Sequence, residues 1–209
     1  MKSDLDNSPS WPGFDAYYTL FAVECSVDER HILQVLSLAD LPLPGATLIR
    51  ILKALAWRSE DDKVTLDVLF QRHLQLWPKR WERLEWITDD GGRIRCSRFL
   101  VDLLSRQLVL EAKVEAVKAA VNQQIATSFW SSGVDPEMRP LRVAFYSGDM
   151  AYLRDWLGLD AENPWAGQIT PDREEVITNF CYFPLQQPWL DQLPEWPHYH
   201  ALAGPIRAD

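Results

Sequence analysis

Apolar residues recur at intervals of three and four along most of this chain, the spacing that places them on one face of an α-helix. Residues 65–77 give the clearest case. One side of that helix would carry Leu66, Leu69, Phe70, His73, Leu76 and Trp77. The same pattern predicts helices over residues 14–25, 26–38, 46–58, 79–87, 98–130, 149–158 and 170–180. The chain is therefore expected to be mainly α.

Several helix ends are marked by residues that satisfy or interrupt the backbone. Ser26 and Glu29 have the spacing of a capping box, which predicts that a helix begins there. Two prolines and a glycine in residues 40–45 end that helix. Asp149 and Gly158 are placed to cap the two ends of a later helix. Residues 141–149 between these helical segments fit either a strand that ends in a turn or a short helix.

The helical pattern is interrupted near residues 86–96 by the signature of a β-hairpin. Gly91 and Gly92 can both take positive φ, as a tight turn requires. After them, Ile94 and Cys96 alternate with arginines, which predicts a half-buried strand. A short β-hairpin is therefore expected between two helices.

Residues 98–130 are predicted to form one long helix. Its apolar positions alternate at spacings of three and four, as in a heptad seam. The seam residues are Leu100, Leu103, Gln107, Leu110, Val114, Val117, Val121 and Gln124. Such a seam would pack against another helix of the same chain or, in a homo-oligomer, against a second copy through residues 100–124.

The C-terminal part differs in composition from the rest. Glycine and prolines in residues 131–140 mark a boundary, and aromatic rings and prolines are interleaved after Phe180. Because disordered segments are poor in aromatic residues, these rings are expected to be covered. We therefore predict an extended aromatic and proline-rich C-terminal arm whose Trp189, Trp196 and Tyr199 contact a partner or the globule.

These patterns together predict the organisation of the chain. Residues 1–13 are polar and would form a disordered lead-in without the apolar segment of a secretory signal. Residues 14–132 would form a helical body with the hairpin near 86–96. Residues 133–209 would form a helical region and the arm, packed on the body.

Charge changes the picture because it is unevenly distributed. The chain has a net charge of −9, whereas residues 72–118 carry ten basic and seven acidic groups, a net of +3. Any contact with nucleic acid is therefore expected within residues 72–98. The candidate contact residues are Arg80, Arg83, Arg93, Arg95 and Arg98.

A helix followed by a basic hairpin and another helix resembles winged-helix architecture in outline. The resemblance implies a hairpin wing near phosphates and a preceding helix in a groove. Against this, Glu82, Glu85, Asp89 and Asp90 lie in the same stretch and reduce the positive field. The same arginines could equally contact a protein partner or pair with acids inside the fold.

The remaining composition argues against catalysis. The sequence contains no phosphate-binding loop, dinucleotide-binding glycine motif or zinc-protease motif, so no enzyme activity, cofactor or metal is predicted. Three widely spaced cysteines predict buried free thiols in a reducing compartment, and no apolar run is long enough to span a membrane. The sequence therefore favours a cytoplasmic, non-catalytic protein-binding adaptor, accessory factor or complex subunit. The alternative is a winged-helix-like nucleic-acid-binding protein of replication, regulation or defence.

Overall fold

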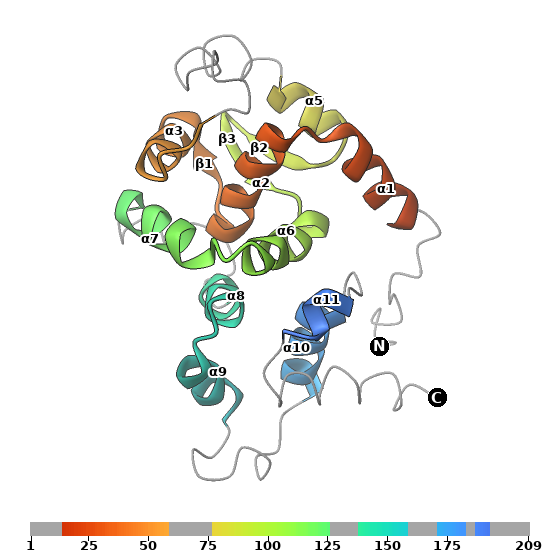
Figure 1. The fold of residues 1–209 in the computed structure, drawn as a ribbon, viewed down its shortest axis with the longest axis vertical. Helices are drawn as coiled ribbons and strands as arrows, with labels where there is room; N and C mark the ends of the chain where they lie inside the picture. The colour runs from red at the N-terminus through yellow and green to blue at the C-terminus, as the bar shows by residue number, and fades with distance from the viewer. Residues whose placement is uncertain (1–13, 59–76, 126–137, 159–170, 183–186, 193–209) are drawn as a thin grey trace.

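The computed structural model describes residues 14–58, 77–125, 138–158, 171–182 and 187–192. Within these ranges the protein is mostly helical and contains a small antiparallel sheet, as the sequence predicts (Figure 1). The first part of the chain forms α1 (Phe14–Glu24), α2 (Val27–Ala39), β1 (Leu43–Pro44), α3 (Gly45–Ala54), α5 (Trp77–Arg83), β2 (Ile87–Asp90) and β3 (Arg93–Cys96). It is followed by α6 (Arg98–Leu110), α7 (Val114–Gln124), α8 (Met138–Ser147), α9 (Met150–Leu157), α10 (Pro171–Tyr182) and α11 (Gln187–Leu190).

The predicted capping box at the start of α2 is confirmed. The Ser26 hydroxyl accepts a hydrogen bond from the Glu29 backbone N–H at 3.2 Å, and the Glu29 carboxylate accepts from the Ser26 N–H at 2.9 Å. Asp149 and Gly158 cap α9 as predicted. Residues 141–149, left open between strand and helix, belong mainly to α8.

Helix α3 ends earlier than predicted. The pattern indicated a helix over residues 46–58, but α3 stops at Ala54, and Ala56 takes the left-handed conformation with φ 50°. The helix predicted over residues 65–77 lies outside the described residues except for Trp77, which begins α5.

The predicted hairpin is confirmed, and a third strand joins it. Gly91 and Gly92 form the turn between β2 and β3 with φ of 59° and 83°. Strand β1 pairs with β3 on the other side, so the strand order is β1-β3-β2. The sequence did not predict β1 because it contains only Leu43 and Pro44, within a stretch rich in helix breakers.

The single long helix predicted over residues 98–130 is wrong. The described part consists of α6 and α7, because Ala112 takes a left-handed conformation with φ 54° that no helix can continue through. The predicted seam is therefore not continuous. Five of its residues are buried in the chain's own core, namely Leu100, Leu103, Val114, Val117 and Val121. Since α6 and α7 use these residues against α2 and α3, residues 100–124 do not present an unbroken seam to a second copy.

The buried residues fall into two clusters. The larger lies among α1–α7 and the sheet, and includes Ile32, Leu48 and Trp86. The smaller lies among α8–α11, and includes Phe145 and Phe180. Figure 1 shows α6 and α7 between these two parts. The boundary predicted at 132/133 and the lead-in 1–13 lie outside the described residues.

The described part of the predicted C-terminal arm is helical, not extended. Phe180 and Cys181 lie in α10, and Trp189 lies in the short helix α11. The prolines that argued against helix are spaced widely enough to allow a short helix, with Pro188 near its start, where the missing N–H is not needed. Residues 193–209 lie outside the described ranges.

Candidate interaction surface

Arg80, a predicted contact residue, is committed to an ion pair inside the fold. Its guanidinium donates to the Glu29 carboxylate, to the Glu24 backbone carbonyl at 2.7 Å and to the Glu24 carboxylate at 3.2 Å. Glu29 is only 3% exposed and also accepts from the indole N–H of Trp81 at 2.9 Å. Burial alone would raise the pKa of Glu29, but these hydrogen bonds together lower it. The network fixes α5 to the junction of α1 and α2.

Arg95 is also paired inside the fold. It donates twice to the Asp40 carboxylate, at 2.8 and 3.1 Å. Asp40 is 2% exposed and pairs as well with Arg142 of α8, which in turn donates to Asp102 at 3.0 Å. Burial opposes the charge of Arg142, but the two carboxylates outweigh it and raise its pKa.

The other three predicted arginines are exposed and lie on three different elements. Arg83 ends α5, and Arg98 begins α6, where its guanidinium lies 5.0 Å from the ring centre of Phe99. Arg93 lies directly opposite Asp90 in the hairpin. Of the five candidates, therefore, Arg80 and Arg95 are paired with buried carboxylates, and Arg93 lies opposite an acidic residue in the hairpin.

The tip of the hairpin is acidic on its exposed side. Asp89 and Asp90 are both exposed, and Asp89 accepts a hydrogen bond from the Gly92 N–H at 2.8 Å. This bond stabilises the turn and leaves the carboxylate at the tip. A phosphate approaching the tip would meet these two negative charges together with the single positive charge of Arg93, which lies opposite Asp90.

The two most exposed large apolar residues of the described chain lie on α1. Val23 is 76% exposed and Leu20 43%, and Val27, the first residue of α2, is 38% exposed. Leu20 and Val23 are three positions apart and share one side of α1, while Phe21 and Cys25 face the core. We call Leu20 and Val23 the α1 stripe.

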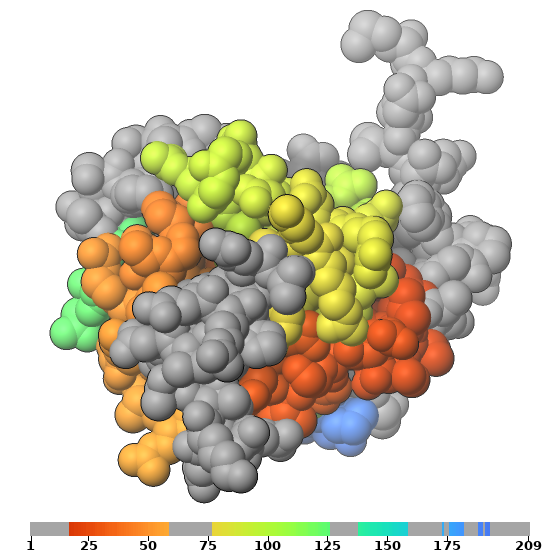
Figure 2. Space-filling view, turned by 90° about the horizontal axis from the view of Figure 1, so that it is seen from above, coloured from red at the N-terminus to blue at the C-terminus, as the bar shows by residue number. Residues whose placement is uncertain are grey.

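The apolar run of residues 14–25 predicted a helix but did not indicate which of its sides is exposed. The available signal was Thr19, which is exposed and lies one turn from Val23 on the same side. Figure 2 shows α1 and α5 side by side at the surface. The Tyr17 hydroxyl donates to the Glu85 backbone carbonyl at 3.0 Å and joins the two segments.

Trp189, the first of the predicted partner-binding aromatics, is occupied by the chain itself. It is 3% exposed, and its ring centre lies 5.5 Å from that of Tyr146 and 6.1 Å from that of Phe145. The guanidinium of Arg106 lies 5.8 Å from the same ring. Trp196 and Tyr199 lie outside the described residues, so their contact with a partner stays a prediction.

Within the described ranges, no three His, Cys, Asp or Glu side chains are grouped to hold a metal ion. No helix in those ranges is both long and apolar enough to cross a bilayer. A scan against models of protein families, and searches of curated proteins and of solved structures, found no match.

Proposed function

We propose that this protein is a non-catalytic adaptor or complex subunit that binds a partner protein through the α1 stripe. The observation that carries the proposal is the exposure of Leu20 and Val23 beside an ion-paired surface. Exposed apolar side chains clustered on one face and rimmed by polar groups are typical of protein interaction sites.

The stripe is held on a rigid support. Arg80 joins α5 to the last residue of α1, and Tyr17 joins the start of α1 to Glu85. Binding of a partner here would cost little free energy for ordering the surface, because the side chains are already positioned. Helix α5, which Arg80 joins to Glu24, carries exposed charges of both signs, namely Lys79, Glu82 and Arg83, and these would contribute a polar rim.

The sheet supports a winged-helix-like arrangement for the body. The order helix, strand, helix, helix and hairpin, with strands in the order β1-β3-β2, has the outline of that architecture. Winged helices serve as protein-binding modules as well as nucleic-acid readers. Here the acidic tip at Asp89 and Asp90 favours a protein partner over phosphate.

A cytoplasmic location is part of the proposal. Cys25, Cys96 and Cys181 are buried thiols that form no disulfide with one another, and burial raises the pKa of Cys25 and Cys181 to about 12. Such thiols are inert, small apolar core groups, as a protein made in a reducing compartment would have.

The test is a tagged pull-down from the native host, with and without nuclease, followed by mass spectrometry. The tagged chains are the natural sequence, a variant with Leu20→Gln and Val23→Glu, and a control with Tyr152→Ser. Tyr152 is 38% exposed on α9, away from the stripe. We expect a stoichiometric protein that survives nuclease, is retained by the control and is lost on the order of tenfold from the stripe variant. Equal retention by the natural chain and the stripe variant would refute the proposed surface.

Nucleic-acid binding is the second candidate, favoured by the exposure of Lys79, Arg83 and Arg98 around α5 and α6. Its test is the binding of a labelled duplex as a function of salt, with Arg83→Glu plus Arg93→Glu as the variant. Arg95 is left unchanged because its loss would disturb Asp40. Binding that falls steeply with salt and is abolished by this variant would support the second candidate. Binding that ignores salt would exclude it.

A further inference from the structure

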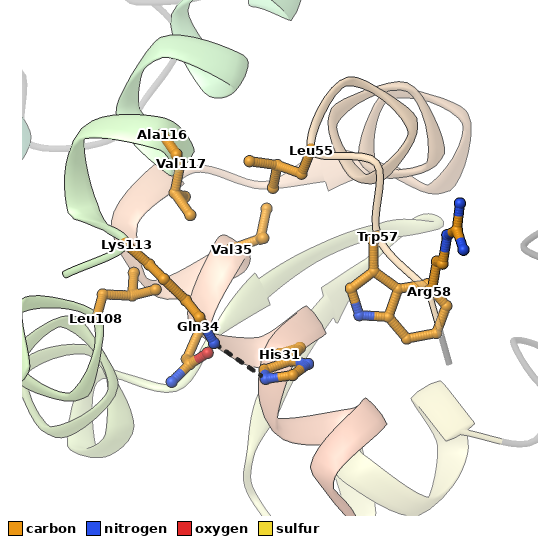
Figure 3. Close-up of a pocket in the computed structure, with 10 residues that line it drawn as sticks. All are labelled: His31, Gln34, Val35, Leu55, Trp57, Arg58, Leu108, Lys113, Ala116 and Val117. Atoms are coloured by element: carbon orange, nitrogen blue, oxygen red, sulfur yellow. Dashed lines mark hydrogen bonds between the residues drawn. The ribbon is translucent and has the colours of Figure 1, made fainter. Parts of the chain in front are cut away.

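A half-open cavity of about 320 Å³ lies between α2, the chain after α3, and the junction of α6 and α7. Figure 3 shows its lining residues arriving from these separate parts of the body. The volume is at the lower end of the range for small-molecule sites. None of its lining residues comes from α1, so the cavity is separate from the α1 stripe.

The floor of the cavity is apolar and well packed. Val35, Leu108 and Val117 are each 4% exposed or less, and Leu55 is half-buried beside them. These side chains come from α2, α6, α7 and the residue after α3. A floor built from four segments is held by the whole core of the body, so the cavity is preformed.

The charged or titratable residues that line the cavity are all bases, and the neutral amide of Gln34 lies beside them. His31, Arg58 and Lys113 line it, and none of its lining residues is acidic, although the chain carries a net charge of −9. In Figure 3, Lys113 reaches across to His31, and Arg58 lies beyond Trp57 on the other side. Arg58 is exposed and makes no ion pair with any residue in the described ranges.

Trp57 adds a donor inside the cavity. Its indole nitrogen is buried and finds no acceptor among the described residues. In Figure 3 this nitrogen is on the side of the ring that faces His31. A buried N–H without an acceptor is unfavourable, and an acceptor on a bound molecule would satisfy it.

We propose that this cavity binds a small amphipathic carboxylate, with the apolar body of the ligand on Val35, Leu108 and Val117. The carboxylate would accept from Trp57 and lie between Arg58 and Lys113. An apolar chain fits the apolar floor of the cavity, and Arg58 and Lys113 attract a negatively charged head group. A neutral ligand would gain nothing from the positive charges of Arg58 and Lys113.

Glu111 and Lys113 provide a test of the proposal, because removing their charges should change anion binding in opposite directions. Its carboxylate accepts from Lys113 at 2.6 Å and from the Gln34 amide at 3.1 Å, but it does not line the cavity. It therefore competes with a bound anion for Lys113. Removing the charge of Glu111 should strengthen anion binding, whereas removing the charge of Lys113 should weaken it.

The experiment is calorimetric titration of the full chain with decanoate, below its micelle-forming range, and with decanol as the uncharged match. We expect decanoate to bind more tightly than decanol. Arg58→Gln with Lys113→Gln should weaken decanoate about tenfold and leave decanol unchanged. Glu111→Gln should strengthen decanoate about twofold to fivefold. Equal affinity for the two probes, or the same response of both to these variants, would overturn the anion assignment.

The location is tested with Ala116→Trp, which places an indole in the cavity from an exposed position of α7. Ala119→Trp, exposed on the same helix outside the cavity, is the matched control. Ala116→Trp should abolish binding of both probes, and Ala119→Trp should not. Thermal melts verify that each variant is folded. Absence of decanoate binding to the natural chain, or binding unaffected by Ala116→Trp, would overturn the site.

Discussion

A single carboxylate, that of Asp40, joins the end of α2 to strand β3 and helix α8. It accepts from Arg95 and Arg142 while its backbone takes the left-handed φ of 43°. An acid at a helix C-terminus opposes the helix dipole, so its position is stable only because two cations offset its charge. The sequence alone could not predict this cluster, because Arg142 lies 102 residues away from Asp40.

Asp40→Asn is expected to lower the free energy of unfolding by about 3 kcal/mol, because it leaves two partly buried guanidinium groups without their shared partner. Asparagine tolerates the left-handed backbone, so the charge is the main change. Urea denaturation followed by circular dichroism measures the effect. Asp90→Asn, on the exposed tip, should shift the midpoint little. Equal effects of the two substitutions would contradict the role assigned to Asp40.

Glu29 should make stability depend on pH. Its pKa in the folded chain lies below its ordinary value of 4.5, because Ser26, Trp81 and Arg80 bind the charged form more strongly than burial disfavours it. The contribution is therefore complete above pH 4.5 and is lost as pH falls through the lowered pKa.

Glu29→Gln is accordingly expected to cost about 2 kcal/mol at pH 7 and progressively less below pH 4.5. The measurement is the urea midpoint of the natural chain and the variant from pH 7 to pH 3. Glu82→Gln, exposed on α5, is the control. A difference that stays constant across this range would show that the Glu29 charge is not what stabilises the fold. The sequence did reveal half of this site, since Ser26 and Glu29 are close neighbours along the chain.

At the scale of elements, the break between α6 and α7 depends on Ala112. Its left-handed φ of 54° is unfavourable for a residue with a Cβ, and its side chain is exposed. The apolar spacing continues through the break, so the pattern of residues 98–130 predicted one helix. The spacing of apolar residues reflects which residues are buried, and α6 and α7 bury their apolar residues in the same core.

Ala112→Gly is expected to stabilise the protein by about 0.5–1 kcal/mol, because glycine adopts this φ without strain. Ala119→Gly, at an exposed position inside α7, should destabilise it by a similar amount, since glycine is unfavourable within a helix. Chemical denaturation of the two variants compares the signs directly. If both substitutions destabilise the protein, the left-handed conformation at Ala112 is not a source of strain.

For the whole molecule, Arg106 is a buried link between the two cores. It is fully buried, and it donates to the Phe180 carbonyl at 2.8 Å and to the Asn179 carbonyl at 3.3 Å. These carbonyls belong to the last turn of α10, where they have no partner within the helix. Arg106 thus caps α10 from α6. Local patterns predicted both helices, but nothing in them showed that an arginine would be buried between the cores.

Arg106→Leu should loosen α10 and α11 while the larger core remains intact, since two helix-end carbonyls lose their donor at a cost of about 1–3 kcal/mol. Hydrogen exchange measured by mass spectrometry should show faster exchange in residues 171–192 and unchanged protection in α2. Arg98→Leu, at the exposed start of α6, is the matched control. Uniform loss of protection across both cores would contradict a local capping role.

The sheet also bears on how copies of this protein behave towards one another. Both of its outer strands are short, β1 carries Pro44 with no N–H to donate, and β2 carries exposed Asp89 and Asp90. Proline, short length and charge are the devices by which open edges resist pairing with further strands. Self-association by strand addition is therefore blocked at both edges. Replacing Asp89 and Asp90 with valine would remove one of these barriers and create an edge prone to aggregation.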